Sequence, residues 1–95
     1  MTYSIFQLPN KHDNLFMNHR WATNHGGINL QEYVTVYTGE IDGTDPMEIL
    51  ERIYTIFNTK HPDDYRGRSL SVSDLVALEN TGTYFCDSVG WKQIN

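Results

Sequence analysis

The sequence has little of several features that define large classes of proteins. It contains one cysteine, Cys86, in 95 residues, so no disulfide can form within the chain, as is usual in a reducing compartment. No apolar run is long enough to cross a bilayer, and Met1–Ser4 lacks the basic and hydrophobic pattern that opens a secretory signal. From these absences we expect a cytoplasmic protein that has no contact with a membrane.

Basic residues are also scarce. Seven Lys and Arg residues stand against twelve Asp and Glu residues, which gives a formal net charge of −5 at pH 7. Binding along a phosphate backbone depends on clustered cations that release counterions, so this balance argues against direct DNA binding. The excess of acid instead favours solubility and faster encounter with a partner that has a basic surface.

The residues that are present suffice for one small domain. A second independent core would leave each half of the chain too short to fold, so we expect residues 1–95 to form a single domain. Its core would draw on a composition that is 39% hydrophobic and 13% aromatic. Domains of this size have a free energy of unfolding of about 5–10 kcal/mol.

Two segments carry the marks of helices. Asp45 followed by Pro46 predicts the start of a main helix over about residues 46–60, because the first supplies a capping side chain and proline suits the first helical position. Apolar residues then recur at helical spacing on one face, namely Ile49, Leu50, Ile53, Ile56 and Phe57. Asn18 predicts the cap of a shorter helix over about residues 18–25.

The remaining β-forming segments predict strands. Residues 33–41 alternate with a period of two, and residues 2–8 end at Pro9-Asn10. Asn80-Thr81-Gly82 lies between two apolar runs and predicts a hairpin, because glycine readily adopts the positive φ that such a connection needs. Further strands are expected over residues 75–79, 83–88 and 91–94. These elements indicate an α+β domain, a mostly antiparallel sheet packed against the two helices.

Asp74 raises a question of its own. It occupies a position in an alternating segment where an apolar side chain is expected, so it is either a buried reactive acid or a local cap of the backbone. Ser71-Val72-Ser73-Asp74 matches a capping pattern in which the serine oxygen accepts from the Asp74 N–H and the carboxylate accepts from the Ser71 N–H. An unpaired carboxylate in a small core costs on the order of several kcal/mol, so we favour the cap, with Leu75 restarting the apolar alternation.

No motif predicts catalysis or metal binding. Gly67–Ser71 lacks the final glycine of a nucleophile elbow, and Cys86 lies in an expected strand, where cysteine is more often a small buried hydrophobe. Asp42–Asp45 lacks the further ligands of a calcium loop. The histidines lack metal-binding spacing, and they are His12, His19, His25 and His61. We therefore expect a protein that is not an enzyme and needs no cofactor or metal.

The loop after the main helix is the most chemically mixed surface that the sequence predicts. A solvated loop is the simplest interpretation of its charges. The functional interpretation is a protein-binding patch in which the acids face a cationic groove and the tyrosine acts as anchor, since Tyr and Arg contribute much of the energy at interfaces. The residues of this patch are Asp63, Asp64, Tyr65, Arg66 and Arg68. Large aromatics either extend the patch or fill the core, namely Trp21, Tyr84 and Trp91.

Several of these segments together resemble the YodL-like domain family. They are Asn14–Met17, Phe57-Asn58, His61–Tyr65, Gly67–Val76 and Tyr84–Trp91, and the stretch HPDDYRGRSLSVSD is the most specific of them. The resemblance spans nearly the whole chain. It implies an origin in Gram-positive bacteria, often on plasmids, phages or integrative elements, and it supplies no catalytic residues.

The resemblance implies a binding role. Small acidic proteins of mobile genetic elements are frequently inhibitors of host machinery, so we expect an inhibitor such as an anti-CRISPR protein. Such a protein would bind a Cas9-type nuclease complex and interfere with its guide or target nucleic acid. The alternative that the resemblance implies is a regulator that binds the actin-like cell-shape machinery. A small hydrolase that uses Cys86 or Ser69 is the third class.

Overall fold

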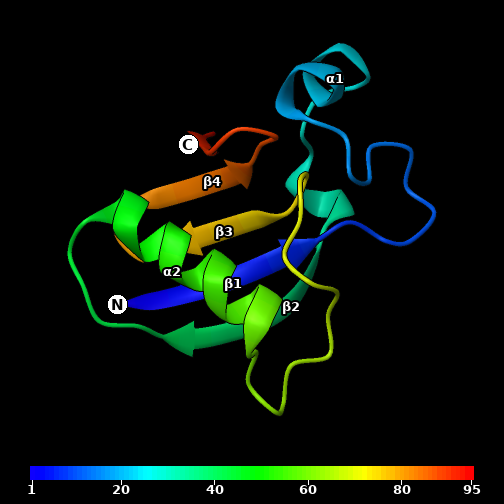
Figure 1. Ribbon diagram of the computed structural model, residues 1–95. Coiled ribbons are helices and arrows are strands. Elements are labelled where there is room, and N and C mark those ends of the chain that lie inside the picture. The colour runs from blue at the N-terminus through cyan, green and yellow to red at the C-terminus, as the bar shows by residue number, and fades with distance from the viewer.

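Five antiparallel strands form one sheet, and one long helix crosses a face of that sheet (Figure 1). The structure is a computed structural model, and it describes residues 1–95. In chain order the elements are β1 (Thr2–Gln7), α1 (His19–Asn24), a 3-10 turn (Leu30–Glu32), β2 (Val34–Glu40), α2 (Pro46–Thr59), β3 (Leu75–Leu78), β4 (Gly82–Cys86) and β5 (Trp91–Gln93). The expected α+β architecture, with one main and one shorter helix, is therefore confirmed.

The first strand holds the sheet together. The strands lie in the order β2-β1-β3-β4-β5, so β1 pairs with two strands that are distant from it in sequence. Ile5 faces Tyr37 on β2 and Val76 on β3. Along β1 every second side chain is buried, as expected for a strand with one face against a helix. The polar Gln7 falls on that buried face and is the exception to its apolar character.

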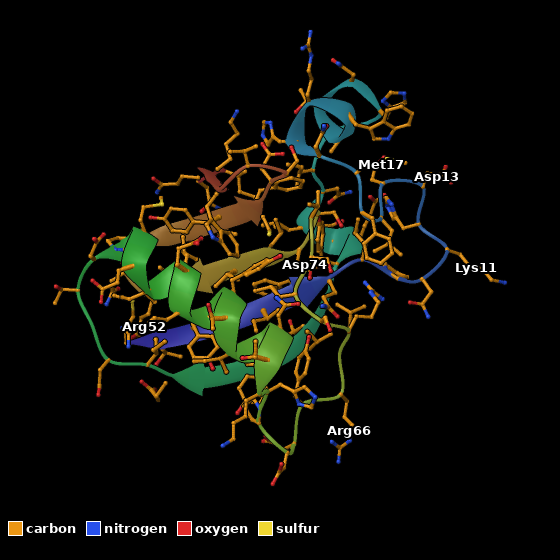
Figure 2. The ribbon with its side chains drawn as sticks, viewed as in Figure 1. Lys11, Asp13, Met17, Arg52, Arg66 and Asp74 are labelled. Atoms are coloured by element: carbon orange, nitrogen blue, oxygen red, sulfur yellow. The ribbon has the colours of Figure 1, made fainter.

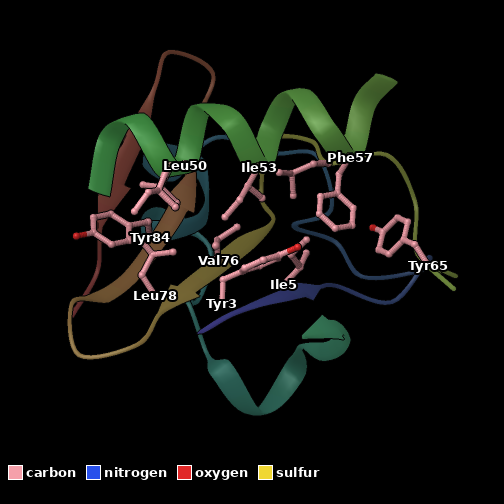
Figure 3. Packing of buried hydrophobic residues seen from close by; sticks show 11 residues of the cluster. Tyr3, Ile5, Leu50, Ile53, Phe57, Tyr65, Val76, Leu78 and Tyr84 are labelled. Carbon is pink, nitrogen blue, oxygen red and sulfur yellow. The ribbon is translucent and has the colours of Figure 1, made fainter. Parts of the chain in front are cut away.

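Helix α2 begins and packs as its sequence predicts. The Asp45 carboxylate accepts a hydrogen bond from the Met47 N–H at 3.2 Å, and Pro46 is the first helical residue. One face of α2 is fully buried against the sheet, and it consists of Ile49, Leu50, Ile53 and Phe57. These side chains form the centre of a cluster of eleven buried residues that joins α2 to the sheet (Figure 3).

The sheet is covered on its second face near one end. His19 of α1 packs the edge of its ring on Phe85, with centroids 5.4 Å apart, and Ala22 of the same helix is buried. The Asn18 side chain caps α1 by accepting from the Trp21 N–H. Leu75 and Val76 are consecutive and both fully buried, because β3 carries core on both faces at this end. The predicted restart of the apolar alternation at Leu75 is therefore wrong, because Val76 is buried as well.

All five strands are shorter by one or two residues than the sequence indicates. The hairpin between β3 and β4 turns through Asn80, which has a φ of 60°, and Gly82 follows with a φ of 149°. The 3-10 turn before β2 and the irregular register between Ile5 and Phe6 carry no clear sequence signal. The helices are all too short or too polar to cross a membrane.

Truncating one core side chain should remove a large part of the stability of this domain. Ile53→Ala is expected to lower the free energy of unfolding by about 2–5 kcal/mol, because Ile53 is fully buried between α2 and the sheet. Thr55→Ala on the exposed side of α2 is the matched control, with an expected change within about 0.5 kcal/mol. Urea unfolding of both variants measures this. A loss below about 1 kcal/mol in Ile53→Ala would show that α2 is not seated as described.

Candidate functional site

The five residues predicted as a contact patch do not share one surface. Asp63, Asp64 and Arg66 are exposed on the loop after α2, but Tyr65 is 4% exposed. Its ring packs edge-on against Phe57, with centroids 4.8 Å apart. Tyr65 therefore cannot be the exposed anchor that the sequence analysis assigned to it. Because the Tyr65 ring anchors the loop in the core, the adjacent side chains of Asp64 and Arg66 are left facing solvent.

Arg68 is half-buried, and both terminal nitrogens of its side chain are used within the chain. Its Nη1 donates to Asn10 Oδ1 and its Nη2 donates to the Leu8 carbonyl, both at 2.6 Å. The guanidinium carbon lies 5.7 Å from the centroid of the Phe16 ring. The Tyr65 hydroxyl donates to the Arg68 carbonyl. Arg68 thus ties the loop to the chain that follows β1, and little of it remains for a partner.

Asp74 is a buried acid and a backbone cap at once. The side chain is 1% exposed and lies between the ends of β1 and β3 (Figure 2). Its Oδ2 accepts from the Ser71 N–H at 2.8 Å, which confirms the carboxylate half of the predicted cap. The serine half is wrong, because the Asp74 N–H donates to the Ser71 carbonyl and the Ser71 hydroxyl donates to the Ser69 carbonyl. The expectation that capping would remove the acid from the core is also wrong.

The partner of this acid is Gln7, which sequence reasoning missed. Gln7 is 2% exposed, and its Nε2 donates to Asp74 Oδ2 and to the Arg68 carbonyl, each at 3.0 Å. Its Oε1 accepts from the Arg68 N–H at 3.0 Å. The amide is therefore fully used, as buried amides require. The signal that could have found it is its position on the apolar face of β1.

Burial raises the pKa of Asp74 to about 7, while hydrogen bonds from Ser71 and Gln7 and the charge of Arg68 act against that rise. The second carboxylate oxygen, Oδ1, is buried without a hydrogen-bond partner, which is consistent with a group that readily holds a proton. The acid therefore titrates near neutral pH. None of the larger surface grooves is lined by Asp74.

The other side chains considered for catalysis or metal binding are buried or hydrogen-bonded within the chain. Burial raises the pKa of the Cys86 thiol to about 12, and a thiol that stays protonated is a poor nucleophile. The Asn14 N–H donates to His12 Nδ1, and His12 Nε2 lies 2.8 Å from a Glu32 carboxylate oxygen, so both ring nitrogens are engaged. No three His, Cys, Asp or Glu side chains are grouped as metal ligands.

Phe16 is the most unusual exposed residue. It has a φ of 66°, in the left-handed region that side-chain-bearing residues rarely adopt, and it is 53% exposed. Its N–H donates to the Ser73 hydroxyl at 3.0 Å. Ser73 is itself buried with a φ of 86°, and its carbonyl accepts from the Tyr33 hydroxyl at 2.7 Å. Two strained residues are thus joined by a hydrogen bond beside Asp74.

An open groove of about 480 Å³, here named the Phe16 groove, lies next to this residue. Its lining includes Phe16, Met17, Arg20, Trp21, His25 and Val72. The Trp21 indole stacks on the His25 ring, with centroids 3.7 Å apart and planes 9° from parallel. Of the three large aromatics that the sequence analysis left open, Trp21 is exposed, Tyr84 is in the core and Trp91 packs at its edge.

Comparison with known proteins gives one family. The model of the YodL-like domain matches residues 2–95. A curated protein of Bacillus subtilis (strain 168), named "Uncharacterized protein YodL", is 30% identical over 69 residues. That alignment spans 66% of this chain and 66% of the relative, just under two thirds of its length. No solved structure matches the chain.

Asp74 should make stability fall as the pH rises toward neutrality. Its folded-state pKa of about 7 lies above the ~3.9 of an unfolded aspartate, so the folded state binds the proton more tightly. This contribution is fully present below about pH 4 and is lost as the pH rises through about 7. Relative to Asp74→Asn, the free energy of unfolding of the wild type should fall by about 2–3 kcal/mol from pH 5 to pH 8.

Chemical denaturation across this pH range measures the effect, and Asp87→Asn is the control. Burial raises the pKa of Asp87, but hydrogen bonds from the His19 and Ser88 N–H groups and the charges of Lys92 and His19 together outweigh burial, so the net shift is downward. Its stabilising contribution is therefore lost only at acid pH, and Asp87→Asn should run parallel to the wild type from pH 5 to pH 8. Parallel curves for Asp74→Asn as well would contradict the assignment of Asp74.

Proposed function

The chain belongs to the YodL-like domain family, and we propose that it is a non-enzymatic inhibitor that acts by docking on a host protein. The observation that carries the proposal is the loop at Asp63 and Asp64. Both acids face solvent on a backbone that is held in place, because Tyr65 is rooted in the core and Arg66 Nη1 donates to the Asp63 carbonyl at 2.8 Å. A surface that is rigid before binding loses less conformational entropy in a complex.

Charge favours a basic partner. The net charge of −5 and the exposed acids of this loop attract a cationic surface and repel an anionic one. The contact surface in this proposal is therefore Asp63, Asp64 and Arg66, with Tyr65 and Arg68 acting as internal supports.

The most specific form of the proposal is an anti-CRISPR protein of a mobile genetic element. RNA-guided nucleases of the Cas9 type hold their guide and target strands in a positively charged channel. An acidic domain is electrostatically complementary to such a channel and would compete with the guide or the target for it. The inhibitor would then act in the cytoplasm, where the nuclease meets its target.

Reversing the charge of the loop should weaken binding to a purified Cas9–guide complex. We expect at least a tenfold loss of affinity for the double variant Asp63→Lys/Asp64→Lys, and a smaller loss for the control Asp42→Lys/Glu79→Lys. The control changes the net charge equally at exposed positions elsewhere. Wild-type binding should also weaken between about 50 and 300 mM salt, since the Debye length is ~10 Å at 0.1 M. Absence of wild-type association, with and without guide, would remove the nuclease as the target.

The family resemblance also implies a second host target, the actin-like cell-shape machinery, and one experiment separates the two. The protein is expressed in a Gram-positive strain that lacks any CRISPR system, and cell width is measured by microscopy. Normal cell shape is expected if the nuclease is the target. Rounded or widened cells would favour the cell-shape machinery, and the same loop variant would show whether the acids are used there.

A further inference from the structure

The conformation of Phe16 has no explanation inside the core. A left-handed backbone at a residue with a side chain costs roughly 1–2 kcal/mol, and this ring is 53% exposed, so little burial offsets the cost. Strain of this kind persists where the surroundings enforce it, and it concentrates at ligand-binding positions. An exposed ring that is held at this cost is suited to contact with a partner.

Three contacts hold Phe16 before any partner arrives. The Ser73 hydroxyl accepts from the Phe16 N–H, and the Arg68 guanidinium lies over the Phe16 ring. The Asn14 carbonyl accepts from the N–H of Met17 at 3.0 Å. Ser73 is fixed in turn by the Tyr33 hydroxyl. The ring is thus preorganised, which reduces the entropy that binding would otherwise cost.

The rest of the Phe16 groove has the composition of an interface centre. Met17 and Trp21 are 37% and 41% exposed, and Trp and Met are enriched at the centres of protein interfaces. His25 holds the indole in place, because it stacks on the ring and its Nδ1 lies 2.8 Å from the Trp21 carbonyl. The groove therefore offers fixed apolar surface to a partner.

Charge identifies the kind of partner. Arg20 is the one charged side chain among the residues that line the groove, although acids outnumber bases in the chain as a whole. We propose that the Phe16 groove docks a partner segment that combines apolar side chains with Asp or Glu, the apolar side chains packing on Phe16 and Trp21 and a carboxylate pairing with Arg20. The rest of the acidic surface repels such a segment, so charge directs it to this groove.

This inference rests on the proposed function only in that the chain acts by docking, because the surface is a different one. Figure 2 shows Met17 near α1 in the upper part of the view and Arg66 near the bottom of it, well apart from each other. The acidic loop faces a basic surface, whereas the groove receives an acidic segment. The two surfaces can therefore contact two regions of one partner, or two partners.

Selection from a random 12-residue peptide library displayed on phage tests the groove, with counter-selection on Trp21→Ala, so that the later measurements at Phe16 and Arg20 stay independent of the selection. The selected peptides should combine apolar residues with Asp or Glu. A Trp91→Phe background leaves Trp21 as the only tryptophan, so its fluorescence reports binding. Affinity should fall at least tenfold in Phe16→Asn and in Arg20→Glu. Lysine in place of the peptide acids should restore binding to Arg20→Glu, which a merely structural role of Arg20 would not produce.

The Phe16→Asn variant also separates docking from folding. Asparagine tolerates the left-handed region better than phenylalanine, so thermal unfolding should occur at the wild-type temperature or a few degrees above it. A variant that folds at least as well and no longer binds shows that the ring serves the partner. A fall in the midpoint of more than about 5 °C would instead place Phe16 in the core and overturn the inference.

Other results decide against the groove in identifiable ways. An absence of selected peptides, peptides without acidic residues, or equal binding to the variants would overturn the inference. Self-association of the wild type that is lost in Phe16→Asn would make a second copy the occupant instead. If no acidic peptide is selected, while the wild type binds the nuclease and the Asp63/Asp64 variant does not, the groove fails and the proposed function stands. If acidic peptides bind the groove but the wild type does not bind the nuclease, the groove stands and the nuclease proposal fails.

Discussion

The hydrogen bond between Gln7 and Asp74 is the contact on which the rest of this structure depends. It joins the end of β1 to the segment before β3, and the same amide pairs with both backbone groups of Arg68. A buried carboxylate alone would be destabilising, but here its Oδ2 has two donors and its pKa moves toward neutrality. The acid thus shapes a loop that has no secondary structure of its own.

Both proposed docking surfaces derive their order from this loop. On one side, Tyr65 enters the core and leaves the neighbouring acids in solvent. On the other, Ser73 holds the backbone of Phe16, and Arg68 lies over its ring. Rigid loops on a small sheet are a common way to present contact residues. An acid that looked like a candidate for chemistry therefore supports the two proposed docking surfaces.

The sequence predicted what local chemistry decides. The start of α2 followed from Asp45 and Pro46, and the α+β architecture followed from period and turn signals. The interior of the contact loop could not be predicted in this way, because Tyr65 and Gln7 are placed by residues more than fifty positions away or across the core. Polar residues such as Gln7 look out of place on an apolar face until their distant partner is known. The exposure of Phe16 could not be predicted for the same reason, because the backbone of this residue is held by a hydrogen bond to Ser73, 57 positions away.

The positive φ of Ser73 has a consequence for how the molecule would evolve. Glycine would fit that backbone more easily, yet it has no side-chain oxygen to accept from the Phe16 N–H. Substituting Ser73 would therefore trade one defect for another, and neighbouring positions would have to change together. The segment should therefore change in sequence as a block, while surface residues on the two faces it supports remain free to diversify.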